Sequence, residues 1–154
     1  SYAYPFTIMR LGSLYLLYAE ALNELNGPSE EVFEYLDKIR ERSGLEGVRE
    51  SWSKYSRFPN KPDTKEGLRE IIHRERTIEL AFESQRFWDL KRWKRAQEEL
   101  NTAIYGWDIL QSSPQTYYRR TVLYSRTFTL RDYFWPISLN ELRRNDELLQ
   151  SPLW

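Results

Sequence analysis

Apolar residues at the start of the chain recur at spacings of three and four, the period of an amphipathic helix. A first helix is expected over residues 7–26, with this apolar stripe: Ile8, Leu11, Tyr15, Tyr18, Leu22 and Leu25. Gly27-Pro28 ends that helix, and Ser29 is a suitable N-cap for a second helix that reaches Ser43. The second stripe contains Val32, Leu36 and Ile39. Because the connection is short, the two helices should form an antiparallel hairpin.

Two further helices are expected, the first from Asp63 or Thr64 to Phe82 or Glu83 and the second over residues 85–101. They would form a second hairpin. Residues 45–63, which contain Pro59 and Pro62, are expected to form a long loop between the two hairpins.

The pattern changes in the last third of the chain. Strand-forming residues gather between residues 117 and 124, but they do not follow a clean period of two. Extended segments and one small β-hairpin are therefore expected, followed by a short helix capped by Ser138-Leu139-Asn140-Glu141. The predicted fold is mainly α, with TPR-like antiparallel helical hairpins and an irregular, aromatic-rich C-terminal segment.

Two carboxylates fall on the apolar stripe of the expected third helix. That stripe reads Leu68, Ile71, Ile72, Glu75, Glu79 and Phe82. A buried carboxylate is costly unless it is paired, and arginine can pair it in bidentate geometry. We therefore expect a structural ion-pair network of Glu75 and Glu79 with Arg40 and Arg86; Arg42 and Arg76 are further possible partners.

Composition excludes several classes of function. The net charge is zero, with acidic and basic residues interspersed, so no nucleic-acid partner is expected. The chain has no cysteine, and its single histidine, His73, is expected on a helix surface. No metal site and no cofactor are predicted.

Four blocks of the chain form an ordered set of motifs. They read RLGSLYLLYAEALN at residues 10–23, LDKIRERSGL at 36–45, ERTIELAFESQRFWDLKRW at 75–93, and DYFWPI from residue 132, followed by EL and QSP. In this order they resemble the SusD/RagB family of outer-membrane proteins. The third block is close to the family signature E-R-x-x-E-L-x-F-E-[G/S]-x-R-[W/F]-[W/F]-D-L-x-R-W. Gly12-Ser13 replaces a common Ala-Glu pair, and Ser138, Asp146 and Ser151 stand where Pro, Pro and Asn are usual.

This resemblance implies that residues 1–154 form the C-terminal domain of a larger lipoprotein. Family members are lipid-anchored, cap a TonB-dependent (SusC-like) transporter and hold oligosaccharide for it. The resemblance thus implies a non-catalytic component of glycan or other nutrient uptake on the cell-surface side of the outer membrane. The lipid anchor, the only membrane attachment expected, would lie outside this chain, and the fragment itself is expected to be soluble.

Trp52 and Tyr55 are the candidate glycan-binding residues, because an exposed ring in a polar loop can stack on the apolar C–H face of a pyranose. The alternative interpretation is that both rings clamp the loop onto the helices. Phe87, Trp88, Leu90 and Trp93 have helical spacing, so they are expected in the core rather than as a sugar platform. Trp135 is expected in core or inter-segment packing.

Two other functions remain open. A helical-repeat protein-interaction module is the main alternative to glycan uptake. A glycoside hydrolase using Glu75 or Glu79 is disfavoured, because its carboxylates would have to face each other across a cleft.

Overall fold

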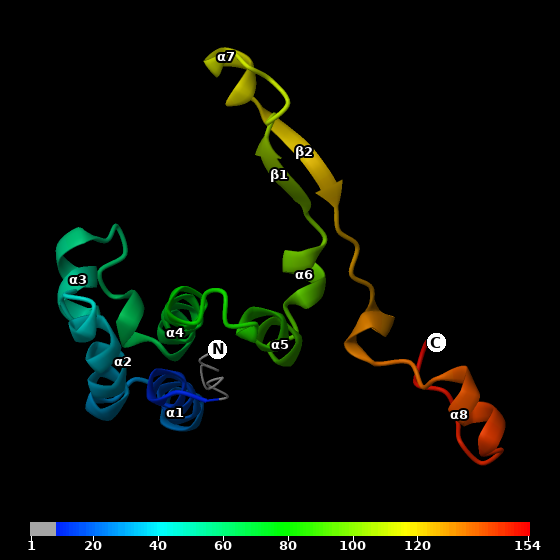
Figure 1. The fold of residues 1–154 in the computed structure, drawn as a ribbon. Coiled ribbons are helices and arrows are strands. Elements are labelled where there is room, and N and C mark those ends of the chain that lie inside the picture. Colours follow the sequence, from blue (N-terminus) through cyan, green and yellow to red (C-terminus); the bar gives the residue numbers. More distant parts are fainter. Residues whose placement is uncertain (1–8) are drawn as a thin grey trace, which may run out of the picture. The chain divides into compact units, whose positions relative to one another are not determined.

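The computed structural model describes residues 9–154, which divide into two compact units at Arg86 and Phe87 (Figure 1). The described part is mainly helical, as predicted, and its only sheet has two strands. Each unit has its own hydrophobic core. None of the described helices combines the length and the apolar character that crossing a bilayer requires.

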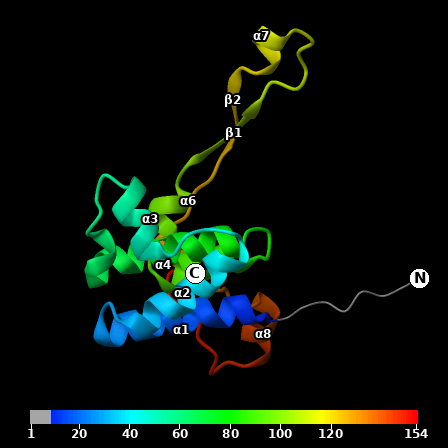
Figure 2. The same cartoon turned by 90° about the vertical axis from the view of Figure 1, so that its left-hand side faces the viewer.

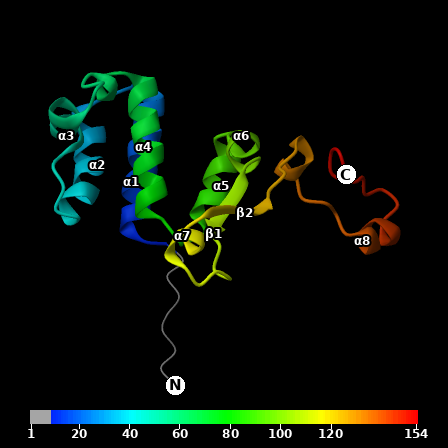
Figure 3. The ribbon, with the colours of Figure 1, turned by 90° about the horizontal axis from the view of Figure 1, so that it is seen from above.

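The first unit is built from α1 (Leu11–Asn26), α2 (Glu30–Arg42), α3 (Val48–Tyr55), the 3-10 turn η1 (Lys61–Asp63) and α4 (Lys65–Glu79). Helix α1 packs against both α2 and α4, as seen in Figure 3 for α1 and α4. The buried apolar residues of this core are Leu16, Ala19, Val32, Phe33, Leu36, Ile39, Val48, Leu68, Ile71 and Ile72. The helical arrangement confirms the fold class, whereas the likeness to a TPR repeat stays a prediction.

Local signals set the ends of these helices. The Ser29 side chain accepts a hydrogen bond from the Val32 amide at 3.4 Å, and Thr64 caps α4 in the same way through the Gly67 amide at 3.1 Å. Gly27 and Gly44 follow α1 and α2 with φ of +78° and +71°, a region that glycine enters without strain. The predicted α1–α2 hairpin is confirmed.

The predicted loop over residues 45–63 is wrong, because α3 lies inside it. The Asp37 carboxylate accepts a hydrogen bond from the Val48 amide at 2.7 Å, which holds the first turn of α3 against α2. Val48 is fully buried, and Arg40 donates to the Glu46 carbonyl at 2.8 Å. These contacts join α3 and the turn before it to α2 across 11 and 6 positions of the chain, so the periodicity within the segment did not reveal this helix.

The predicted helix over residues 85–101 is also wrong, because it is interrupted. The structure has α5 (Gln85–Arg92) and α6 (Ala96–Leu100), separated by Lys94 with φ of +60°. The helix before it ends at Glu79, earlier than expected, and Phe82 and Ser84 also have positive φ. A left-handed residue cannot continue a right-handed helix, so each of these positions breaks the helical path.

The second unit contains most of α5, then α6, β1 (Ala103–Trp107), α7 (Pro114–Tyr117), β2 (Arg120–Ser125), η2 (Leu130–Tyr133) and α8 (Leu139–Arg144). Strands β1 and β2 pair antiparallel with an irregularity between Ile104 and Tyr105, which confirms the predicted small hairpin. Figure 2 shows α7 at the tip of this hairpin. The core is small: buried Leu90, Ala96 and Phe128, with Trp93, Leu100 and Tyr133 packed against them.

Several burial predictions were wrong. On α1, Leu11 and Leu25 are exposed, and the buried face is instead Leu16, Ala19, Glu20 and Asn23. His73 is buried, at 7% exposure, rather than on a helix surface. Leu90 and Trp93 do join the second core, but Phe87 and Trp88 are partly exposed and Trp135 is 65% exposed.

Candidate functional site

The two carboxylates on the stripe of α4 are each held by arginine from another helix. Arg40 of α2 contacts Glu75 at 2.5 Å, and Arg42 contacts Glu79 at 2.7 Å. Arg10, just before α1, also bonds the Glu79 carboxylate. Side-chain exposure is only 9% for Glu79. These pairs therefore join the ends of three helices, the arrangement of a structural network.

Arg10 reaches a second carboxylate, Glu83, with Nε at 2.9 and 2.8 Å from its two oxygens. These hydrogen bonds, helped by the charge of Arg10, hold the pKa of Glu83 below its usual range. The bonds to Glu83, and then those to Glu79, raise the pKa of Arg10. Both groups are thus charged at neutral pH.

Arg86, also expected in the network, donates a hydrogen bond to the Thr77 hydroxyl at 2.7 Å. Thr77 in turn donates to the His73 carbonyl at 2.7 Å. The structure thus brings Arg40, Glu75 and Glu79 into ion pairs and links Arg86 to α4 by this hydroxyl.

A second charged cluster inside the first unit was missed by the sequence reasoning. Glu20 of α1 lies 3.8 Å from Arg76 Nε and 3.8 Å from His73 Nε2, and all three side chains are buried. The sequence predicts Arg76 only as a partner of Glu75 and Glu79. The available signal was the spacing of Leu16, Ala19, Glu20 and Asn23, which places Glu20 on the face that is buried.

Trp52 and Tyr55 lie on α3 and line the same open cavity of about 690 Å³. Arg40, Glu46 and Arg74 contribute charged groups to its lining. The size is within the range of small-ligand sites. The structure thus brings together the two residues singled out from the sequence, on a helix rather than in a loop.

The two rings differ in their surroundings. Trp52 is half-buried and packs against the first core, with Lys61 Nζ at 5.5 Å from its ring centroid. Tyr55 is 71% exposed, and Lys54 Nζ lies 5.2 Å from its ring. Tyr55 is therefore available for stacking, whereas Trp52 has a packing role.

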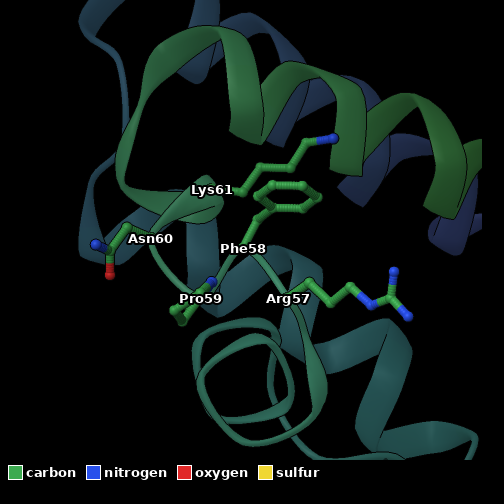
Figure 4. A pocket seen from close by; sticks show the side chains of 5 residues that line it. All are labelled: Arg57, Phe58, Pro59, Asn60 and Lys61. Atoms are coloured by element: carbon green, nitrogen blue, oxygen red, sulfur yellow. The ribbon is translucent and has the colours of Figure 1, made fainter.

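A neighbouring cavity of about 560 Å³ is lined by the segment that follows α3, residues 57–61. Figure 4 shows the Phe58 ring beside the Lys61 side chain, with Arg57 extending separately. Lys61 is held by Glu70 at 2.5 Å, and Phe58 is exposed. Aromatic and cationic side chains thus continue along the chain beyond Tyr55.

The second unit has its own aromatic cavity, of about 400 Å³, which sequence reasoning did not identify. Phe87, Phe134, Trp135 and Trp154 line it. Trp154 Nε1 donates to the carbonyls of Arg131 and Phe134, both at 3.2 Å, which orients the indole. The signal was the density of aromatic residues: the sequence predicts packing for Phe87 and Trp135, and it gives Phe134 and Trp154 no role.

Trp52→Ala is expected to lower the free energy of unfolding by about 2 kcal/mol. A fully buried tryptophan costs about 3–5 kcal/mol when truncated, and Trp52 is only half-buried. Denaturant unfolding followed by circular dichroism measures the change. Tyr55→Ala is the control, since an exposed residue on the same helix should change stability by no more than about 0.5 kcal/mol. Equal stability of the two variants would mean that Trp52 does not hold α3 on the core.

Comparison with known proteins places these features in a family. The sequence model of the SusD family matches residues 1–154. The chain belongs to the SusD family. Two similar proteins of Formosa agariphila are SusD-like protein P2, 34% identical over 141 residues, and SusD-like protein P25, 31% identical over 144 residues. The matches cover 92% and 94% of the chain but only 24% and 23% of those proteins.

Solved structures of SusD-like proteins share the fold. A SusD-like protein of Bacteroides fragilis superimposes with a TM-score of 0.76 at 32% identity, covering 99% of this chain and 28% of the other. A SusD-like carbohydrate-binding protein of the same species gives 0.70 at 29% identity, covering 92% and 28%. This SusD-family chain therefore spans about a quarter of the length of these relatives.

Proposed function

We propose that this SusD-family chain takes part in the non-catalytic capture of carbohydrate, with the cavity beside α3 as the contact surface. The observation that carries the proposal is the exposed Tyr55 ring in a cavity that also presents Arg74, Ser51 and Ser56. One relative with this fold is described as carbohydrate-binding. Stacking platforms combined with a few polar groups suit a sugar, which has apolar C–H faces and a rim of hydroxyls.

Capture at this surface would need no bond to be broken. A pyranose face stacks on Tyr55, and hydroxyls exchange hydrogen bonds with the polar lining. Glycoside hydrolysis instead requires two carboxylates that flank the scissile bond. Glu75 and Glu79 are engaged with Arg40, Arg42 and Arg10, which favours binding over catalysis.

The family resemblance also supports a role for the whole protein in uptake. In this proposal the full-length protein is held by a lipid anchor at the cell-surface side of the outer membrane. It passes oligosaccharide or another nutrient to a TonB-dependent, SusC-like transporter. Co-purification of the full-length protein with such a transporter from outer membranes tests this part, and recovery without one contradicts it.

A helical protein-interaction module is the second candidate, because α1 presents an apolar face to solvent. Leu11, Leu14 and Tyr18 lie at spacings of three and four and are exposed in the structure. Such i, i+3, i+7 anchors are typical of helix-mediated recognition. Leu14→Glu should abolish transporter co-purification and leave glycan binding unchanged if this face is the docking surface.

Tyr55→Ala is expected to weaken carbohydrate binding about tenfold. Stacking of a nucleobase on an aromatic ring is worth about 1–3 kcal/mol, which serves as a guide for a pyranose, and tenfold corresponds to about 1.4 kcal/mol. Isothermal titration calorimetry with the oligosaccharide that binds best on a glycan array measures the loss. Phe82→Ala is the control, because Phe82 is fully exposed and does not line the cavity. Unchanged affinity for Tyr55→Ala would remove this cavity from the binding site.

A further inference from the structure

Most basic side chains of the first unit are neutralised by a carboxylate. Lys54 contacts Glu46 at 2.6 Å, Lys61 contacts Glu70 at 2.5 Å, and Arg69 contacts Glu24 at 2.5 Å. This pairing is typical of a chain with no net charge. A basic side chain without such a partner therefore stands out in this unit, because its charge is available to bind an anion.

Arg57 and Arg74 are the exceptions of interest. Neither guanidinium makes an ion pair, a hydrogen bond or a ring contact with any of residues 9–154. Both side chains are exposed. Arg74 lines the cavity of Tyr55, and Arg57 lines the neighbouring cavity with Phe58 (Figure 4).

The other charges at these cavities are already compensated. Arg40 is paired with Glu75, Glu46 with Lys54, and Lys61 with Glu70. The charge of Arg74 thus remains available beside the exposed ring of Tyr55, and that of Arg57 beside Phe58. Each cavity thus combines an aromatic stacking face with an arginine that pairs with no carboxylate in the described part of the chain.

We propose that the carbohydrate bound at this surface is anionic, and that Arg74 binds its carboxylate or sulfate group while Tyr55 stacks on the sugar ring. This inference rests on the proposed function and specifies its ligand class. A guanidinium matches the paired oxygens of either anion with two parallel N–H bonds. Arg57 lies on the segment after α3 and supplies a second contact for a longer chain of acidic sugars.

The test compares charged and neutral forms of one oligosaccharide. Tetragalacturonate is titrated against its methyl-esterified form, and a sulfated galactan tetrasaccharide against its desulfated form, with each protein variant in low and high salt. The wild-type protein is expected to bind a charged form at least about tenfold more tightly than its neutral form. Added salt should weaken this preference, because the contact is exposed to solvent.

Arg74→Gln should reduce binding of the charged form about tenfold and leave binding of the neutral form unchanged. Arg69→Gln removes the same charge from the same helix, but Arg69 is held by Glu24 outside the cavity, so this control should keep wild-type affinity. Measuring binding at low pH distinguishes a carboxylate ligand from a sulfate ligand. Binding of the uronate is lost once its carboxylate is protonated, whereas binding of the sulfate ester persists.

Each failure has its own meaning. Equal affinity for charged and neutral forms, or equal losses in Arg74→Gln and Arg69→Gln, would overturn the anionic ligand and leave carbohydrate capture intact. No binding of any of the four probes by a folded protein would overturn the anionic ligand. No binding to any oligosaccharide on the glycan array would overturn the proposed function as well.

Discussion

Glu20→Ala is expected to lower the free energy of unfolding by about 3–5 kcal/mol, the usual cost of removing one partner from a buried ion pair. Glu20 is 7% exposed and lies between Arg76 and His73 of α4, in the interface of α1 with α4. Arg76 is only 2% exposed, so its guanidinium would lose this carboxylate in a place that water barely reaches. Denaturant unfolding monitored by circular dichroism measures the loss.

A matched surface variant controls for the deletion of a carboxylate. Glu34 pairs with Lys38 one turn away on α2 and is largely exposed, so Glu34→Ala should change stability by less than about 0.5 kcal/mol. The double variant Glu20→Ala/Arg76→Met should recover part of the loss, since it removes both charges together. Wild-type stability for Glu20→Ala alone would show that the buried arginine does not depend on Glu20.

Glu79→Ala is expected to destabilise the protein by about 3 kcal/mol, or to lower the melting temperature by about 6–12 °C. Its carboxylate is 9% exposed and joins Arg10 to Arg42. Removing this carboxylate breaks the ion pairs that connect the start of α1 and the end of α2 to the end of α4. The expected value lies at the lower end of the range for buried pairs, because Arg42 itself is exposed to solvent. Differential scanning calorimetry measures the melting temperature.

Glu83→Ala is the control for Glu79, because Glu83 shares Arg10 but is more exposed. Exposed pairs contribute about 0–1 kcal/mol, so this variant should melt near the wild-type temperature at neutral pH. Arg10 lowers the pKa of Glu83 in the folded state, so the contribution of this group is present above its unfolded pKa. It is lost as the pH falls through the lowered folded pKa. Equal effects of the two variants would contradict the special role of Glu79.

Local sequence signals were sufficient to predict the helices whose ends are capped by residues only a few positions away. The Gly27-Pro28-Ser29 connection predicts the α1–α2 hairpin, because the stop and the cap act through bonds inside one turn. The stripe of α4 likewise predicts that Glu75 and Glu79 face arginines, since a helix period fixes which residues share a face. The cavity around Trp52 and Tyr55 combines residues from separate parts of the chain and could not be predicted in this way.

The buried face of α1 shows where periodicity is not enough. Residues 14–18 read Leu-Tyr-Leu-Leu-Tyr, apolar around most of the helix, so several stripes satisfy the same period. Packing against α2 and α4 selects the face with Leu16 and Glu20 and leaves Leu11 exposed. A choice among equivalent stripes depends on neighbours that the local sequence does not contain.

The sequence by itself determined the mainly helical class, the first hairpin, the acidic positions on α4 and the family. Only the tertiary structure decided that α3 forms, that Trp52 packs while Tyr55 is exposed, and that Arg57 and Arg74 pair with no carboxylate among residues 9–154. Helix period and capping act over one or two turns, so nearby residues in the sequence determine them. Burial and ion pairing instead join side chains tens of residues apart, such as Arg40 with Glu75, and exist only once the chain has folded.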